Sequence, residues 1–228
     1  MTISDHQETL PDILPIFPIT GVLLLPGGQL PLNIFENKYL AMVEDTLKDS
    51  RLIGMIQPQD SVPEEIVKTK CANGLPIFRT GCAGKITSFS ETKDGRYEIV
   101  LTGWSRFSVD QEIEKVNGYR RVVADWDSYK KDLNGGLNCL DIDRKRLYKL
   151  LDEFFALHDI SCSWESIEAA PDSKLITALS MICPLEPSEK QGLLEASDCK
   201  KRAEMFMTML ELAIHSGVSG DQGGNPRH

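Results

Sequence analysis

The sequence has no hydrophobic run long enough to cross a membrane. Its most apolar stretch, residues 13–25, is interrupted by Pro15 and Pro18 and falls short of the ~20 apolar residues that a spanning helix needs. The N-terminus lacks the basic start and apolar core of a secretory signal peptide. We therefore expect a cytoplasmic protein with no membrane partner.

Histidine and cysteine are scarce, and their spacing does not suggest chemistry. Of the four histidines, His6 and His228 lie in terminal segments. His158 and His215 lie near predicted helix ends, where the helix dipole favours a charged imidazole. The six cysteines form no CxxC pair and no zinc-finger pattern with histidine. We expect no catalytic residue, no metal and no cofactor, and reduced, mostly buried thiols as is usual in the cytosol.

The glycine-rich segment Gly81–Thr87 lacks the spacing of a phosphate-binding loop. Arg79 stands where that loop requires its first glycine, and Ile86 stands where it requires Ser or Thr. Cys82 lies among these glycines, but a reactive thiol also needs a nearby cation or helix N-terminus. A small buried core residue is the simpler interpretation, and a thiol enzyme acting through Cys82 is kept as an alternative.

Acidic residues outnumber basic residues in this sequence. Lys and Arg total 25 against 34 Asp and Glu, so the formal net charge is −9. A surface of this charge repels polyanions, which argues against nucleic acid as a partner.

The 228 residues of the sequence divide into two parts with different patterns. Residues 13–128 hold short apolar runs rich in Pro, Gly and β-branched residues, with one helical pattern. Residues 144–216 hold apolar stripes of helical period. We assign residues 129–143 to a linker, and residues 1–12 and 217–228 to disordered tails. The fold class is predicted to be α+β.

The expected elements follow from these patterns. Strands are predicted at 13–17, 30–35, 51–57, 76–89, 96–101, 106–113 and 119–126. Helices are predicted at 36–48, about 147–155, 172–182, 188–194 and 198–215. Pro31 favours an edge position for its strand or the start of a strand. Asp172 is expected to cap its helix, and Ser188 to begin a capping box.

Irregular Pro and Gly motifs recur in order along the chain. They lie in residues 14–18, 22–27, 30–39, 81–86 and 94–107, and Glu189–Glu195 adds a helical motif. In these residues the chain resembles, over 13–215, the N-terminal substrate-binding domain of the Lon ATP-dependent protease. More closely, it resembles the stand-alone bacterial proteins built from that domain alone. One departure is Lys38-Tyr39, where the family usually has Arg-Tyr.

The resemblance implies a fold and a function. The fold is a PUA-like β pseudo-barrel with one inserted helix, followed by a C-terminal α-helical bundle. The function is non-catalytic recognition of unfolded or degron-bearing protein segments, with Lon protease or its clients as partners. The sequence has no Walker motif and no Ser–Lys protease dyad. PUA-like barrels elsewhere can bind RNA, so an RNA-binding protein is kept as a second alternative.

The motif residues are interpreted mainly as architectural. The structural set comprises Pro26, Gly27, Phe35, Glu36, Tyr39, Gly84, Arg106 and Phe107. Glu36 is hypothesised to pair with Arg106 or Arg79, because these ionic residues stand within apolar motifs. The candidate binding residues are Phe17, Leu23, Leu24 and Leu25, since this run is more apolar than a turn-adjacent stretch needs. The alternative interpretation is that these four residues belong to the hydrophobic core.

Overall fold

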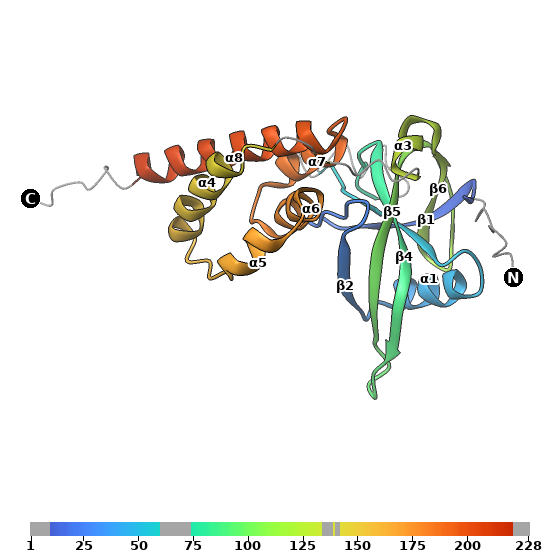
Figure 1. Cartoon of the computed structure of the whole chain (residues 1–228). Helices are drawn as coiled ribbons and strands as arrows, with labels where there is room; N and C mark the ends of the chain where they lie inside the picture. Colours follow the sequence, from blue (N-terminus) through green and yellow to red (C-terminus); the bar gives the residue numbers. More distant parts are fainter. Residues whose placement is uncertain (1–9, 60–73, 134–138, 140–141, 221–228) are drawn as a thin grey trace, which may run out of the picture. The chain divides into compact units, whose positions relative to one another are not determined.

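The computed structural model describes residues 10–59, 74–133, 139 and 142–220. It divides into two compact units, Met1–Gly136 and Leu137–His228. The first unit carries all the described strands, and the second is helical (Figure 1). This arrangement is α+β, as expected. The division falls inside the segment 129–143 assigned to a linker.

The first unit is built on a mixed six-stranded sheet in the order β2-β5-β4-β3-β1-β6. The strands are β1 (Ile13–Pro18), β2 (Gln29–Ile34), β3 (Leu52–Ile56), β4 (Thr80–Glu91), β5 (Tyr97–Val116) and β6 (Tyr119–Asp125). β6 also pairs with β5, so five strands are linked in a ring and β2 lies outside it. β1 and β3 are parallel, and the other pairs are antiparallel.

β5 is one strand of 20 residues where the sequence suggested two. The sequence suggested that the strand is interrupted near Gly103 and Trp104. In the structure these residues form a β-bulge opposite Ala83 and Gly84. A bulge inserts a residue and bends the strand without ending it. The first half of β5 can therefore pair with β2 and β4, and the second half with β4 and β6.

Phe107 belongs to the hydrophobic core of the first unit and is fully buried. A Cβ atom on Gly81 would lie 2.5 Å from its ring, so this position must be glycine for the ring to fit. Around Phe107 are packed Leu14, Ile16, Leu52, Ile56, Val109 and Val122.

Helices complete the first unit. α1 (Asn37–Leu47) is tied to the sheet through Asp45, which accepts a hydrogen bond from the Tyr119 hydroxyl at 3.1 Å. After β6 the chain forms a short 3-10 helix (Asp127–Tyr129) and α3 (Lys130–Leu133). Residues 129–133 are thus helical, where the sequence analysis placed the start of a linker.

The second unit consists of helices whose apolar stripes face one another. They are α4 (Arg144–Leu157), α5 (Trp164–Ala169), α6 (Asp172–Ile182), α7 (Pro187–Glu195) and α8 (Cys199–Gly220). Phe154, Leu193, Phe206 and Leu210 are buried in this unit. No helix among the described residues has the length and apolar character of a membrane span.

Several details of the helical unit differ from expectation. α5 was not predicted, because six residues show too little periodicity. Pro171, and not Asp172, is the N-cap residue of α6. The capping box of α7 joins Glu186 to Glu189, two residues before the predicted start. α8 continues to Gly220.

The expectation of reduced thiols is wrong for two cysteines. Cys139 and Cys199 form a disulfide that closes 60 residues of chain. The spacing of cysteines in the sequence gives no sign of this pair, because only the folding of α4 to α8 brings its two ends together.

Candidate functional site

The four binding residues proposed from the sequence are buried. Phe17 retains 8% of its exposed area, and Leu23, Leu24 and Leu25 retain 3% or less. Phe17 packs against the Tyr39 ring, with 4.1 Å between ring centroids. This burial supports the alternative that the sequence left open, a place in the core. Their role in binding stays a prediction.

The Pro26-Gly27 motif forms a turn against β5. Gly27 has a φ of +78°, and its N–H donates to the Gly103 carbonyl at 2.9 Å. A Cβ on Gly103 would lie only 2.0 Å from the Leu25 carbonyl oxygen. Glycine at both positions therefore lets two backbone segments meet closely. Gly84 is similarly crowded by Leu24 and Leu101, whereas Phe35 is largely exposed.

The proposed pairing of Glu36 with an arginine is wrong. Glu36 is exposed at the start of α1, and its carboxylate lies 2.9 Å from the Lys38 amine. Arg106 instead binds Asp132 with two side-chain hydrogen bonds of 2.8 and 2.9 Å. Arg79 donates to the Val109 carbonyl. An exposed carboxylate at a helix N-terminus keeps its hydration, so it needs no buried cation.

Cys82 is fully buried in β4, and its thiol donates to the Ala83 carbonyl at 3.7 Å. A reactive cysteine needs exposure and a stabilised thiolate. The structure gives Cys82 the small-core-residue environment that the sequence favoured. No cluster of three or more metal-ligating side chains was found in the part of the chain that the structure describes.

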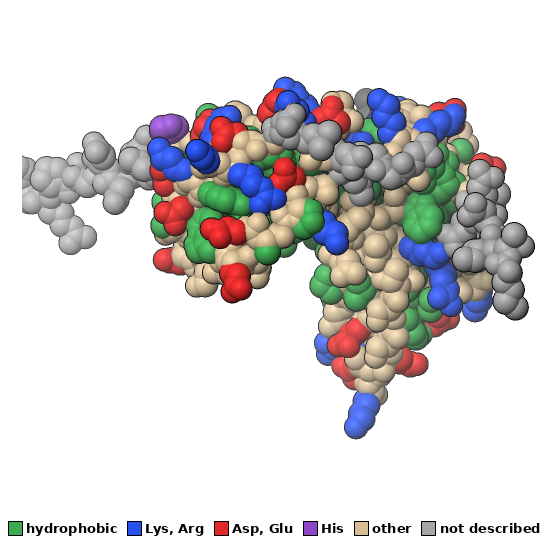
Figure 2. All heavy atoms as spheres, in the orientation of Figure 1, with side chains coloured by type: hydrophobic (Ala, Val, Ile, Leu, Met, Phe, Trp, Pro, Cys, Tyr) green, Lys and Arg blue, Asp and Glu red, His purple; other side chains and the backbone are tan. Residues whose placement is uncertain are grey.

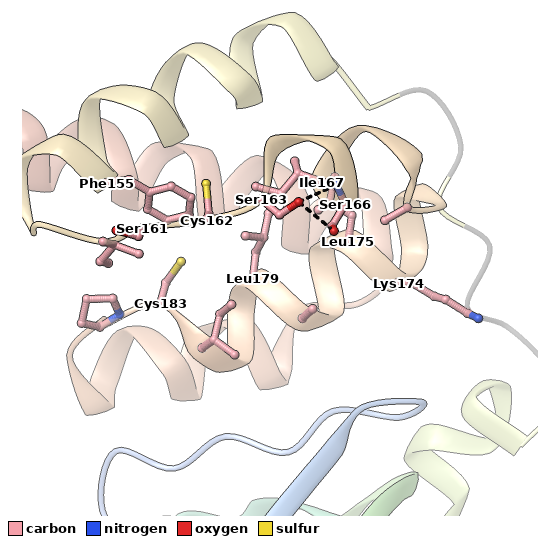
Figure 3. Close-up of a pocket in the computed structure, with 15 residues that line it drawn as sticks. Phe155, Ser161, Cys162, Ser163, Ser166, Ile167, Lys174, Leu175, Leu179 and Cys183 are labelled. Carbon is pink, nitrogen blue, oxygen red and sulfur yellow. Dashed lines mark hydrogen bonds between the residues drawn. The ribbon is translucent and has the colours of Figure 1, made fainter.

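The helical unit holds an apolar pocket of about 720 Å³ (Figure 3). The end of α4, the 160–163 segment, α5 and α6 form its walls. Its larger side chains are Phe155, Ile160, Ile167, Leu175, Leu179 and Ile182. Ile182 is 72% exposed at the pocket, so it offers an apolar surface to a ligand. The volume is in the range typical of ligand sites.

The polar groups at this pocket are neutral or point away. The Ser163 hydroxyl accepts hydrogen bonds from the Ser166 N–H and hydroxyl. Burial raises the pKa of the Cys183 thiol to about 12, although nearby Lys190 opposes this shift. The Lys174 side chain leads away from the other labelled residues in Figure 3. Cys162, a free and exposed cysteine, also lines the pocket. Most of the lining is apolar, so the pocket can hold apolar groups.

A second hollow of about 440 Å³ lies on the sheet over β2, β4 and β5. Pro31, Asn33, Ser88, Ser90 and Glu98 line it, which makes it more polar than the helical pocket. Among the strands that the structure describes, β2 pairs only with β5, so its other side is an edge of the sheet. The prediction that Pro31 lies in an edge strand is confirmed.

The helical pocket was missed from the sequence. The sequence places Ile182 at the end of the helix at 172–182 and does not predict its exposure, and the 160–171 segment has no clear period. The one available signal was the apolar content of the helix at 172–182, which includes Leu175, Ile176, Leu179, Met181 and Ile182.

The sequence of this chain is similar to that of a known protein family. The family model for the ATP-dependent protease La (LON) substrate-binding domain matches residues 13–211. Lon protease 2 of Myxococcus xanthus is 24% identical over 90% of this chain and 24% of that protein. The Lon protease of Cytophaga hutchinsonii is 25% identical over 91% of this chain and 25% of that protein. The chain thus spans about a quarter of the length of these relatives.

Solved structures agree in fold. A Lon N-terminal domain protein from Xanthomonas campestris superposes with a TM-score of 0.55 and 21% identity, covering 86% of this chain and 97% of that one. The N-terminal domain of a Mycobacterium avium complex Lon protease gives 0.58 and 14%, covering 87% and 98%. Because the family model spans far more than half of the residues, this chain belongs to the Lon substrate-binding domain family.

Proposed function

We propose that this chain is a non-catalytic protein- and peptide-binding module of the cytoplasm. It binds unfolded or degron-bearing segments, and it acts as an adaptor or client binder for a Lon protease. The observation that carries the proposal is the apolar pocket of the helical unit with the exposed Ile182 beside it. Unfolded segments expose the apolar side chains that such a pocket buries.

The family supports the recognition role. Its model is described as a substrate-binding domain, and the matching relatives are named as Lon proteases. The ATPase and protease activities of such machines need parts for which this sequence has no motif. Binding without chemistry is therefore the function we assign to these residues.

A binding measurement tests the proposal. A fluorescently labelled, permanently unfolded reporter protein is titrated with the full chain, and its anisotropy is recorded. Ile182→Glu places a charge at the pocket and should weaken binding about tenfold, since one well-placed apolar contact contributes more than about 1 kcal/mol.

Leu212→Glu is the matched control. Leu212 is an aliphatic residue of α8, 60% exposed, and it does not line the pocket. This variant should bind the reporter as the parent does. Absence of any binding to unfolded protein, or selective binding of RNA, would refute the proposed function. An equal loss of reporter binding in both variants would show that the pocket is not the binding site.

A further inference from the structure

We propose that the helical pocket selects apolar segments flanked by lysine or arginine. The inference rests on the proposed function and specifies its substrate class. It starts from the contrast between a pocket interior without charge and a surrounding surface with an excess of carboxylates.

The interior excludes charged groups. Apolar side chains form most of its wall, and its buried thiol, Cys183, is neutral at physiological pH. The Ser163 and Ser166 hydroxyls are bonded to each other. A charged ligand group placed there would lose its hydration without a partner, which is costly. The part of the client inside the pocket must therefore be apolar.

The surroundings are acidic. The carboxylates within two positions of a lining residue are Glu153, Asp159, Glu165, Glu168, Asp172 and Glu186, and the matching basic residues are Lys174 and His158. Two further cations lie beside the pocket, because Lys190 acts on the Cys183 thiol and Arg144 donates to the Ala170 carbonyl. The carboxylates outnumber these basic groups. Glu153 lies 3.9 Å from Lys149, and Asp172 binds Arg144. The other four carboxylates have no ion-pair partner within the described ranges. Of these four, Glu186 caps α7 by accepting a hydrogen bond from the backbone of Glu189. The charges of Asp159, Glu165 and Glu168 can act on a segment bound at the pocket.

Figure 2 shows the same pattern on one face of the molecule. Carboxylate side chains lie beside the apolar patches of the helical unit, with Lys and Arg side chains interspersed among them. Asp159 directly precedes Ile160 of the pocket, and Glu168 directly follows Ile167. A peptide with its apolar centre in the pocket extends its flanks past these residues. At low salt, charges within about 10 Å interact, so basic flanks are attracted and acidic flanks are repelled.

The test uses the full chain and four labelled peptides. Three share one apolar centre of Leu and Phe residues and carry flanks of two Lys, two Ser or two Glu. The fourth joins Lys flanks to a Ser-Gly centre. At about 50 mM salt the Lys-flanked apolar peptide should bind roughly tenfold more tightly than the Glu-flanked one. At about 500 mM salt this ratio should fall toward one, because screening removes the contribution of the flanks.

Matched variants locate the effect. Asp159→Asn with Glu168→Gln removes two carboxylates at the pocket, and Asn also tolerates the left-handed backbone of Asp159, whose φ is +53°. Asp110→Asn with Glu114→Gln removes the same charge from exposed positions of the barrel unit. The first variant should lose most of the Lys-over-Glu preference, and the second should keep it.

The outcomes separate the two proposals. If the three apolar peptides bind equally, the charge preference is wrong while the proposed function stands. If none of them binds, the proposed function itself fails. Equal binding by the Lys-flanked Ser-Gly peptide, or equal effects of the two variants, would show general charge attraction and would also overturn the inference.

Discussion

At the scale of single residues, Arg106 and Asp132 form a buried ion pair that holds α3 on β5. Their side chains are only 5% and 7% exposed, and the Arg106 guanidinium lies 4.4 Å from the centre of the Tyr129 ring. Arg106→Ala leaves the Asp132 carboxylate buried without its cation, so we expect a loss of about 3–5 kcal/mol in the free energy of unfolding. Urea titration of the barrel unit measures this loss.

The exposed pair Arg96–Asp94 supplies the comparison. Arg96→Ala should change stability by less than about 1 kcal/mol, because solvent screens exposed ion pairs. Similar losses for the two arginine variants would contradict the role given to Arg106. The sequence singled out Arg106 as an ionic motif residue, but it could not supply the partner, because α3 was not predicted.

Cys183 gives a prediction about pH. Burial raises the pKa of its thiol from an ordinary value near 9 to about 12. The unfolded chain releases this proton first, so the stability that the neutral thiol contributes is complete below pH 9 and is lost between pH 9 and 12. At pH 9.5, iodoacetamide should label the exposed Cys162 rapidly and Cys183 slowly, as followed by mass spectrometry. Equal labelling rates would refute this assignment.

At the scale of elements, the Cys139–Cys199 disulfide ties the start of the helical unit to the first residue of α8. Closing a loop of 60 residues restricts the unfolded chain, which corresponds to about 4 kcal/mol of stability in the chain-entropy treatment. Cys139→Ser should therefore lower the melting temperature of the helical unit. Dithiothreitol should lower it in the parent but not in the variant, and an effect of reductant on both would contradict the prediction.

Strand β2 gives a second prediction at this scale. Gly103 donates its N–H to the Gly28 carbonyl at 2.8 Å, and antiparallel pairing alternates from that bond. The backbone of Pro31 is thereby turned to the free edge, where proline has no N–H to offer another strand. Pro31→Thr restores a donor there and should increase concentration-dependent self-association, measured by light scattering.

Asn33→Thr is the control for this edge. It introduces the same side chain on the same side of β2, at a position that already has a backbone N–H. It should leave the oligomeric state unchanged. If both threonine variants associate, the side chain and not the missing donor governs the edge.

At the scale of the whole molecule, each compact unit has its own buried aromatic residue, Phe107 in the first and Phe206 in the second. We expect calorimetry to resolve two unfolding transitions. Phe107→Ala should destabilise the first unit and Phe206→Ala the second, each by about 3–5 kcal/mol in the free energy of unfolding. Each variant should therefore lower the midpoint temperature of one transition. A single transition lowered by both variants would show that the units unfold cooperatively.

Much of the fold was available from the sequence for local reasons. The apolar period of residues 147–155 and 172–182 predicts α4 and α6, and Asp94-Gly95 marks the turn between β4 and β5. Pro31 predicts an edge strand because its ring removes a donor. The ordered Pro and Gly motifs identified the Lon substrate-binding family. The structure explains one of these glycines, because a Cβ on Gly103 would clash with the Leu25 carbonyl.

The tertiary structure decided what depends on residues distant in sequence. It buried Leu23, Leu24 and Leu25, joined Cys139 to Cys199, and gave Arg106 its partner Asp132. It also left Ile182 exposed and gathered an apolar pocket from α4, α5 and α6. Local pattern determines which residues form a helix or strand, whereas exposure and pairing depend on which elements pack together. The sequence by itself therefore determined the family and most of its longer elements, and only the packing of the helical unit formed the apolar pocket that we propose as the binding site.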